Sequence, residues 1–392
     1  MLTLILERGR DRSVRRRHPW LFASAVSRLE AAEGEALPGA EVRVVSAEGE
    51  VVGHGHLSPH SVLRVRLVCF GKEPPPEGWL EERIAASVAR RAADPLLGET
   101  EALRLVNAEG DGLPGLIADR YGDTVVVKLT SAGMAARRES VAAALEHATG
   151  LAAGIERADP VSARREGLPA VQGPLWGSPP DAPVWIRERS RRYRVDLLAG
   201  QKTGFYLDQR DSRDLIQAAA RGCRVLDLFA YTGGFSVAAA AGGAASITAV
   251  DSSAAALELA AESLAETAPA VPARLEKADA FRYLRSHSES YDLLVIDPPP
   301  LARARNDVTR ASRAYKDLVL HALRRAAPGA RLLVFACSHH VGPDLFRKIV
   351  FGASLDAGRP VRVLRSVGPP VDHPVSLDHP EGAYLSGLLL EA

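Results

Sequence analysis

Residues 225–236 read VLDLFAYTGGFS, an apolar run that ends in a polar turn with two glycines. A second apolar run, SITAV (246–250), follows and is capped by Asp251. Buried parallel strands carry continuous apolar runs of this kind. Gly233 and Gly234 allow a tight turn and a close approach of the backbone to a ligand. This stretch therefore predicts a doubly wound α/β sheet with a ligand at the carboxyl ends of its strands.

The carboxyl-terminal half of the chain continues this alternation of strands and helices. From about residue 196 onward, apolar segments are separated by helical segments, which indicates βαβ units. We expect a Rossmann-like domain with a mostly parallel, seven-stranded sheet. The predicted strands are 224–229, 246–250, 273–277, 291–296, 331–337, 361–366 and 384–391.

Acidic residues follow two strands of this predicted sheet. Asp251 lies where a carboxylate can accept both hydroxyls of a ribose. Asp279, with Phe281 two residues later, can accept from an adenine amino group beside a covering ring. The turn lacks the GxGxxG pattern that binds a pyrophosphate, and the chain has no P-loop. The combination favours a nucleoside without phosphates and predicts S-adenosylmethionine as the cofactor.

The amino-terminal half follows a different pattern. Residues 40–69 alternate in the manner of strands and predict a small all-β module. The proline-rich segment GKEPPPEGW (71–79) ends this pairing and acts as a linker. A long hairpin over 103–130 marks an α+β region beyond it. We therefore expect three domains, at residues 1–72, 76–188 and 189–392.

Composition limits the class of protein. The chain has 392 residues, of which 46% are hydrophobic and 25% charged, as in globular proteins of two or three domains. Cys69, Cys223 and Cys337 are too far apart in sequence for a disulfide framework or a zinc site, and a reducing cytoplasm suits them. We expect no metal site, no signal peptide and no membrane segment, since no apolar run approaches the roughly 18 residues that a span requires.

Arginine supplies nearly all of the positive charge. Only six of the 49 basic residues are lysines, and the net charge is +1. Clustered arginines suit phosphate recognition and predict an RNA-binding face, although a high-GC genome gives the same bias. The three clusters are Arg8, Arg10, Arg12, Arg15, Arg16 and Arg17; Arg187, Arg189, Arg191, Arg192 and Arg194; and Arg303, Arg305, Arg310 and Arg313.

Two residues at the predicted ligand edge indicate the chemistry. Asp297 follows the fourth strand in YDLLVIDPPP (291–300), and Cys337 ends the fifth. A thiolate that adds to C6 of a pyrimidine makes C5 nucleophilic, and a carboxyl group near N3 stabilises the charge that develops. We therefore predict Cys337 and Asp297 as a catalytic pair. Cys223 precedes the first strand and belongs at the opposite end, and the histidines at 339 and 340 are better explained as loop residues than as bases.

These motifs, together with GQKTGFYLDQRDSR (200–213), resemble the RlmI-type family of 23S rRNA cytosine-C5 methyltransferases over essentially the whole chain. RRRHPWLFASAV (15–26) is similar to the opening of the family's PUA domain, and NAEGDGLPGLIADRYGD (107–123) to its central hairpin. The resemblance implies a class I methyltransferase domain preceded by a small β-barrel PUA-like domain and an α+β central domain. It further implies RNA as substrate and a possible homodimer.

The resemblance also implies the individual site residues. Asp297 corresponds to the acid of motif IV and Cys337 to the nucleophile of motif VI. The family's cofactor-binding positions correspond to Lys202, Thr203, Phe205, Gln209, Asp227, Phe229, Tyr231, Thr232, Gly233, Asp251, Ser252, Asp279, Ala280 and Phe281.

Two other functions stay open at this point. One is methylation of an exocyclic amine of guanine or adenine in RNA. Enzymes of that kind usually place an aromatic residue directly after an Asn/Asp-Pro-Pro triplet, whereas Pro300 and Leu301 stand here. The other is an rRNA-binding assembly factor that keeps the fold without turnover.

Overall fold

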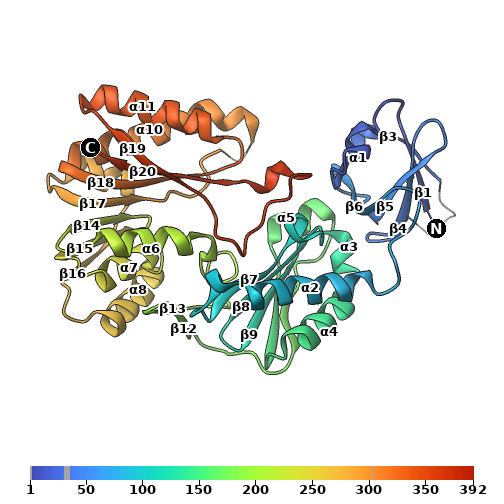
Figure 1. Cartoon of the computed structure of the whole chain (residues 1–392), viewed down its shortest axis with the longest axis horizontal. Helices are drawn as coiled ribbons and strands as arrows, with labels where there is room; N and C mark the ends of the chain where they lie inside the picture. The colour runs from blue at the N-terminus through green and yellow to red at the C-terminus, as the bar shows by residue number, and fades with distance from the viewer. Residues whose placement is uncertain (1, 31–35, 303) are drawn as a thin grey trace. The chain divides into compact units, whose positions relative to one another are not determined.

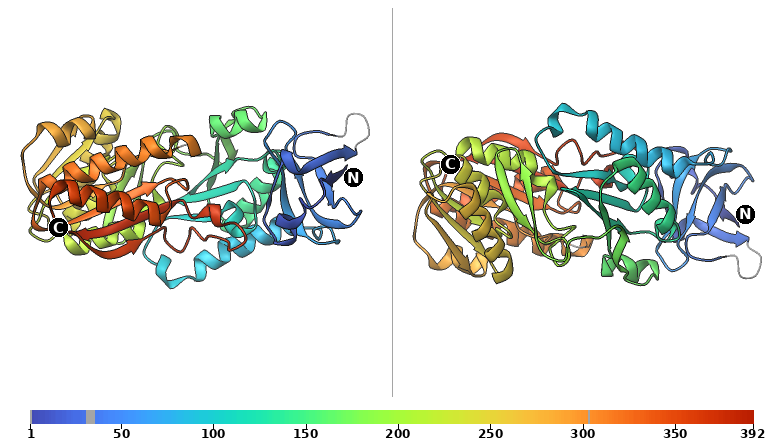
Figure 2. Two further views of the ribbon diagram at one scale, coloured as in Figure 1. Left: turned by 90° about the horizontal axis from the view of Figure 1, so that it is seen from above. Right: turned by 90° about the horizontal axis from the view of Figure 1, so that it is seen from below.

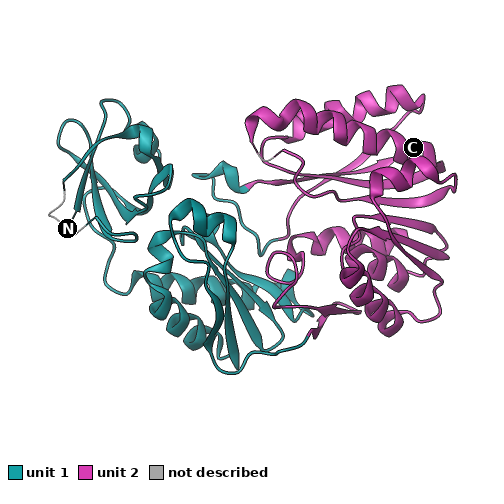
Figure 3. Cartoon of the chain, turned by 180° about the vertical axis from the view of Figure 1, so that it is seen from behind, with its two compact units in different colours: residues 1–182, 371–382 teal, residues 183–370, 383–392 magenta. Residues whose placement is uncertain are grey.

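The computed structural model describes residues 2–30, 36–302 and 304–392, which fall into two compact units (Figure 3). Unit 1 comprises residues 1–182 and 371–382, and unit 2 comprises residues 183–370 and 383–392. The chain therefore leaves unit 2 after residue 370 and returns to it at residue 383. The predicted boundaries assigned 371–382 to the third domain, but this segment groups with unit 1.

The first part of unit 1 is a six-stranded sheet with the order β2-β6-β5-β4-β1-β3. Alternate residues of β1 are buried, so one face of the sheet covers a core that includes Leu4, Val44, Leu57 and Val65. The strands predicted over 40–69 are confirmed as β4 to β6. The elements are β1 (Leu2–Leu6), α1 (Arg12–Arg15), β2 (Trp20–Phe22), β3 (Val26–Glu30), β4 (Glu41–Val45), β5 (Val51–Leu57) and β6 (Leu63–Phe70).

The second part of unit 1 is a five-stranded sheet with the order β11-β10-β9-β8-β7. The hairpin predicted over 103–130 is present, since β8 pairs antiparallel with both β7 and β9. Helices α2 and α4 pack against each other and against this sheet. The elements are α2 (Trp79–Ala93), β7 (Ala102–Asn107), β8 (Leu116–Tyr121), β9 (Thr124–Leu129), α3 (Ala132–Ala135), α4 (Arg138–Thr149), β10 (Ala153–Arg157), α5 (Pro160–Glu166) and β11 (Gln172–Trp176).

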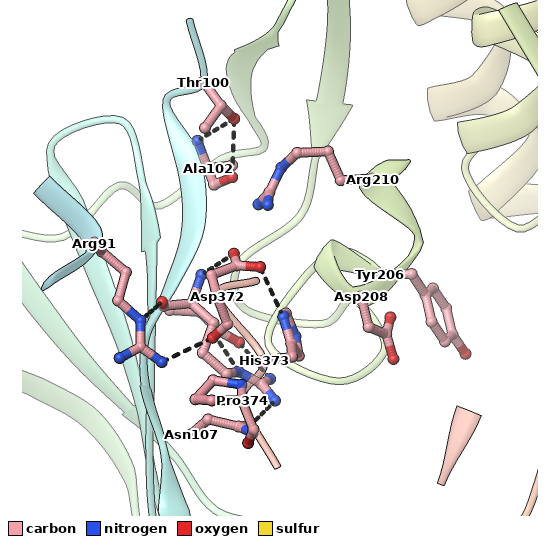
Figure 4. Close-up of polar contacts among 12 residues, drawn as sticks. Arg91, Thr100, Ala102, Asn107, Tyr206, Asp208, Arg210, Asp372, His373 and Pro374 are labelled. Carbon is pink, nitrogen blue, oxygen red and sulfur yellow. Dashed lines mark hydrogen bonds and ion pairs between the residues drawn. The ribbon is translucent and has the colours of Figure 1, made fainter. Parts of the chain in front are cut away.

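Buried polar contacts anchor the segment 371–382 within unit 1 (Figure 4). Asp372 is 0% exposed, and its carboxylate accepts a hydrogen bond of 2.9 Å from the backbone N–H of Arg104. The guanidinium of Arg91 donates to the carbonyl of Asp372 at 2.9 Å. The side-chain amide of Asn107 donates to the carbonyl of Pro374 at 2.9 Å. Burial of the Asp372 carboxylate and of the two carbonyls without these donors would be costly, so the contacts fix the path of the segment.

Replacing Asp372 with alanine should destabilise unit 1 by about 2–4 kcal/mol, because it strips a buried donor of its acceptor. For a unit of this size the apparent Tm should fall by on the order of 5–10 °C. Leu377→Ala is the matched control, since Leu377 lies in the same segment and is fully exposed. Thermal unfolding followed by circular dichroism checks the prediction. Equal Tm values for the two variants would contradict the anchoring role.

Unit 2 contains a seven-stranded sheet with the order β16-β15-β14-β17-β18-β20-β19. Strands β14 to β18 run parallel, while β20 runs antiparallel to its neighbours β18 and β19. The predicted mostly parallel, seven-stranded sheet is thus confirmed. The strands are β14 (Arg224–Leu228), β15 (Ser246–Asp251), β16 (Ala273–Lys277), β17 (Tyr291–Ile296), β18 (Ala326–Cys337), β19 (Arg362–Val367) and β20 (Leu385–Glu391).

Helices cover both faces of this sheet (Figures 1 and 2). One face carries α6 (Arg210–Ala219), α7 (Gly234–Ala241) and α8 (Ala254–Thr267), and the other carries α9 (Ala280–Ser286), α10 (Val308–Arg325) and α11 (Pro343–Ala357). A hairpin of β12 (Val184–Glu188) and β13 (Arg191–Val195) packs against α7 and α8. Among the described helices, none is long and apolar enough to cross a membrane.

Candidate active site

A cavity of about 460 Å³ opens where β14, β15, β17 and β18 end. Its volume lies within the range of small-molecule sites. Strands β14 and β17 are neighbours although β15 and β16 come between them in sequence, so the cavity lies at the point where the strand order reverses. It is lined by Gln201, Lys202, Phe205, Tyr206, Asp208, Gln209, Arg213, Phe229, Ala230, Tyr231, Gly234, Phe235, Asp251, Ser252, Asp297, Pro298, Pro299, Pro300, Cys337 and Tyr384.

The backbone at the cavity is held in an uncommon conformation. Lys202, Phe229 and Tyr231 have φ values of 52°, 63° and 49°, in the left-handed region that residues with a side chain rarely adopt. The Tyr231 N–H donates to Asp251 at 2.8 Å, and the Tyr231 hydroxyl accepts from the Gln201 N–H at 2.7 Å. The first bond joins the turn after β14 to the end of β15, and the second joins it to the segment around residue 201. Backbone strain of this kind concentrates at functional sites.

Asp251 is oriented by two backbone donors. Its carboxylate oxygens accept from the N–H groups of Tyr231 and Ser253, each at 2.8 Å. Each oxygen keeps a further lone pair, so the carboxylate can still accept hydroxyl groups from the cavity side. The aromatic rings of Phe205, Phe229 and Phe235 also line the cavity. A carboxyl group beside apolar rings suits a nucleoside cofactor such as S-adenosylmethionine.

Gly233 and Gly234 have different tasks. Gly233 precedes α7 with a φ of 76°, and a Cβ there would lie 2.8 Å from the Cβ of Ala260 in α8. The space beside Gly233 is thus taken by a helix, and Gly233 is not among the cavity-lining residues. Gly234 does line the cavity. Gly233 permits the left-handed turn and the packing of α7 on α8, whereas the close approach that we expected for both glycines is available at Gly234.

Gly233→Ala should cost about 2–4 kcal/mol of stability, combining left-handed strain with the clash against Ala260. Gly243→Ala is the control, because Gly243 has a similar φ of 81° and no atom within 4 Å of its added Cβ. That control should lose only the roughly 1–2 kcal/mol of backbone strain. Urea unfolding of both variants measures the difference. Losses of equal size would show that packing on α8 contributes nothing.

Other expected cofactor residues are not among those that line the cavity. The carboxylate of Asp227 is buried and accepts from the N–H and hydroxyl of Ser236 at 2.9 and 2.7 Å, which ties β14 to α7. Burial raises the pKa of Asp227 to about 7. Asp279 caps α9 by accepting from the Arg282 N–H at 2.8 Å. Of the remaining expected residues, Thr203, Thr232, Ala280 and Phe281 are likewise absent from the cavity lining, although the ring of Phe281 lies 6.2 Å from that of Phe229.

The structure brings the predicted catalytic pair into contact. The Cys337 thiol donates to Asp297 at 3.2 Å, and the Gln209 amide donates to the other carboxylate oxygen at 2.9 Å. Burial raises the pKa of Asp297 to about 6. Burial and the negative charge of Asp297 also raise the pKa of the Cys337 thiol well above its usual value. At rest the pair is therefore a thiol beside a carboxylate, and the carboxylate can accept the thiol proton.

Sequence reasoning missed a second polar group in the same cavity. The Asp208 carboxylate forms an ion pair with the Lys202 ammonium and accepts from the Tyr384 hydroxyl at 2.6 Å. The ammonium lies 4.4 Å from the centre of the Tyr206 ring. Asp208 lies between Phe205 and Gln209, which the family resemblance implies as cofactor-binding residues. The sequence could therefore have indicated Asp208 as a further residue of the site. Tyr384 precedes β20 and had no comparable signal.

The arginine clusters are less available than their sequence positions indicate. Arg15 binds two acidic side chains of its own unit, and Arg192 and Arg194 pair with acids of α8. Arg191 is buried against Glu188. Arg303 lies outside the described residues. Clustering along the chain thus overestimates the free basic surface, because ion pairs within the fold use part of it.

Comparisons with known proteins agree with this arrangement. A family model described as S-adenosylmethionine-dependent methyltransferase matches residues 136–357, and one described as PUA-like domain matches residues 4–70. Since the first match covers more than half of the chain, the protein is an S-adenosylmethionine-dependent methyltransferase. The predicted cofactor and fold class are thereby confirmed.

Relatives of nearly full length narrow this class. Two proteins named Ribosomal RNA large subunit methyltransferase I are similar to the chain. The one from Alteromonas mediterranea is 39% identical and covers 99% of this chain and 98% of its own, and the one from Salmonella arizonae is 37% identical and covers 98% and 96%. The chain belongs to the family of these large-subunit ribosomal RNA methyltransferases.

Solved structures show the same fold. A protein from Streptococcus mutans described as an S-adenosylmethionine-dependent methyltransferase is 24% identical, with a TM-score of 0.83 over all of both chains. A methyltransferase complexed with S-adenosylhomocysteine is also 24% identical, with a TM-score of 0.85 over all of both chains.

Proposed function

We propose that this chain transfers a methyl group from S-adenosylmethionine to C5 of a cytosine in large-subunit ribosomal RNA. The contact of 3.2 Å between the Cys337 thiol and Asp297 carries this proposal, because carbon 5 of a pyrimidine needs a covalent nucleophile at C6. The PUA-like match and the names of the relatives support RNA as the substrate. Methylation of an exocyclic amine would not require the Cys337 thiol.

The pair begins the reaction by moving one proton. Asp297 accepts the thiol proton, and the sulfur of Cys337 forms a bond to C6 of the base. The proton then passes from Asp297 to N3, which neutralises the charge that the ring has gained. These steps leave C5 enamine-like, and S-adenosylmethionine, when bound, supplies the methyl group that C5 takes. The Gln209 amide holds the carboxylate in place through its bond of 2.9 Å.

The cofactor site follows from the same cavity. We propose that Asp251 accepts the ribose hydroxyls, with Ser252, Phe229 and Phe205 beside the nucleoside. Asp227 and Gly233 act by holding the turn after β14. Asp279 and Phe281 would contact the adenine from the edge of the site.

The organisation of the whole chain is also part of the proposal. The PUA-like domain (1–72) would hold RNA, the central domain (76–188) would connect it, and the methyltransferase domain (189–392) would carry the chemistry. Because 371–382 groups with unit 1, the third domain contributes one segment to the other unit. The target base would be extruded from its stack to reach Cys337. We propose action in the cytoplasm and a homodimer, as the family resemblance implies.

Cys337→Ala should lower methyl transfer by at least roughly 10³-fold, since it removes the nucleophile. Cys223→Ala is the matched control and should keep normal activity, because Cys223 precedes β14 at the opposite end of the sheet. The assay measures labelled methyl transfer to undermodified large-subunit rRNA, followed by mass analysis for 5-methylcytosine. Undiminished transfer by Cys337→Ala, or methylation of an exocyclic amine, would refute the proposal.

The pH dependence should report Asp297. Its pKa is raised to about 6, and it accepts the thiol proton only when ionised, so kcat/KM for RNA should rise with pH through about 6 and then level off. Asp297→Asn should lower kcat/KM by roughly 10²–10⁴-fold and remove this rise. The profile is measured between pH 5 and 8 with saturating cofactor. An unchanged rise in Asp297→Asn would assign it to another group.

A further inference from the structure

The proposed reaction requires one more group than the thiol–carboxylate pair provides. After methyl transfer, C5 carries both a hydrogen and a methyl group, and aromaticity returns only when that hydrogen leaves as a proton. Asp297 is already bound to Cys337 and Gln209 and handles the proton that passes to N3. His339 and His340 follow β18, but neither is among the described residues that line the cavity. A separate acceptor must therefore lie elsewhere in the wall.

Asp208 is a second carboxylate in this wall. It is 2% exposed, it lines the cavity together with Asp297 and Cys337, and its charge acts on both of them. The Lys202 ammonium and the Tyr384 hydroxyl bind one of its carboxylate oxygens. These two partners fix the orientation of the carboxylate, which a proton acceptor in a closed site requires.

Strand pairing links this group to the strand that carries the nucleophile. Cys337 at the end of β18 faces Leu385 at the start of β20, and Tyr384 is the residue just before Leu385. The hydroxyl of Tyr384 reaches Asp208 at 2.6 Å. The thiol and the second carboxylate are thus connected through adjacent strands of one sheet.

We propose that Asp208 accepts the C5 proton in the last step of the reaction. The inference rests on the proposed function. The C5–H bond breaks, its electron pair forms the C5=C6 double bond, and the C6–S bond breaks with its pair remaining on the sulfur of Cys337. The proton at N3 returns through Asp297 to that sulfur, which restores the thiol. Lys202 and Tyr384 are positioning residues in this step.

Asp208→Asn should therefore stall the enzyme after methyl transfer rather than before it. We expect an adduct of protein and RNA that survives sodium dodecyl sulfate and carries the labelled methyl group. Tritium release from RNA made with [5-³H]cytosine should fall by at least roughly 10²-fold, the size expected for loss of an acid–base group. Cys337→Ala in the same chain should abolish the adduct. Asp208→Glu should restore part of the tritium release, because it returns a carboxylate.

Asp344→Asn is the matched control, since this aspartate of α11 is 84% exposed at its side chain and pairs with Lys348 of its own helix. It should release tritium like the wild type and form no lasting adduct. Binding of S-adenosylhomocysteine, measured by calorimetry, shows whether each variant is folded. If Asp208→Asn fails to bind it, Tyr384→Phe decides, and a lasting methylated adduct in that variant supports the proposal.

The outcomes separate the two proposals. A wild-type protein that forms no 5-methylcytosine would overturn the proposed function, and the role of Asp208 with it. A wild type that forms 5-methylcytosine, beside a folded Asp208→Asn variant that releases tritium at the normal rate, would overturn the role of Asp208 alone. If Asp208→Asn is misfolded and Tyr384→Phe forms no lasting adduct, the role of Asp208 is likewise overturned.

Discussion

The site depends on the parallel alignment of β14, β17 and β18, which ends three strands at one edge of the sheet. Leu228 pairs with Ile296, so Phe229 and Asp297 leave the sheet at the same level. Ile296 in turn pairs with Val334, and Cys337 follows within the same strand. Hydrogen bonds between strands therefore set the spacing of the thiol, the acid and the turn after β14. The arrangement therefore does not depend on the conformation of a long loop.

Low polarity around these groups decides their charge states. A carboxylate and a thiol in contact inside a protein favour the form in which only one negative charge is present, because burial penalises each ion and the two repel. Asp297 and Cys337 follow this rule. The reaction then begins from a neutral thiol. A neutral thiol is less susceptible to oxidation than a thiolate. The sulfur of Cys337 becomes nucleophilic only when a base accepts the thiol proton.

Much of the fold of unit 2 and of its site was predictable from sequence, because the features that define them are local or periodic. The strands of unit 2, the acid at 251 and the pair Asp297–Cys337 follow from apolar runs and from the rule that such strands end at one edge. What escaped prediction depends on contacts between distant segments. Tyr384 reaches Asp208 across 176 positions of sequence, and the space beside Gly233 is filled by Ala260 of another helix. The arginine clusters misled in part for the same reason, since acidic partners such as Glu50 and Glu266 lie far away in the sequence.

Residues 371–382 belong to unit 1 although they lie between two segments of unit 2 in the sequence. No single cut in the chain therefore separates the two units. A fragment that stops at residue 182 would contain Arg91 and Arg104 but not the Asp372 that they bind. A fragment that begins at residue 183 would carry that aspartate without its buried surroundings. The gene therefore cannot be cut between the units without leaving hydrogen-bond donors of unit 1, the Arg104 N–H and the Arg91 guanidinium, without the acceptors that Asp372 supplies. Recombination that exchanged the amino-terminal half would have to keep this short segment compatible, which ties the evolution of the two units together.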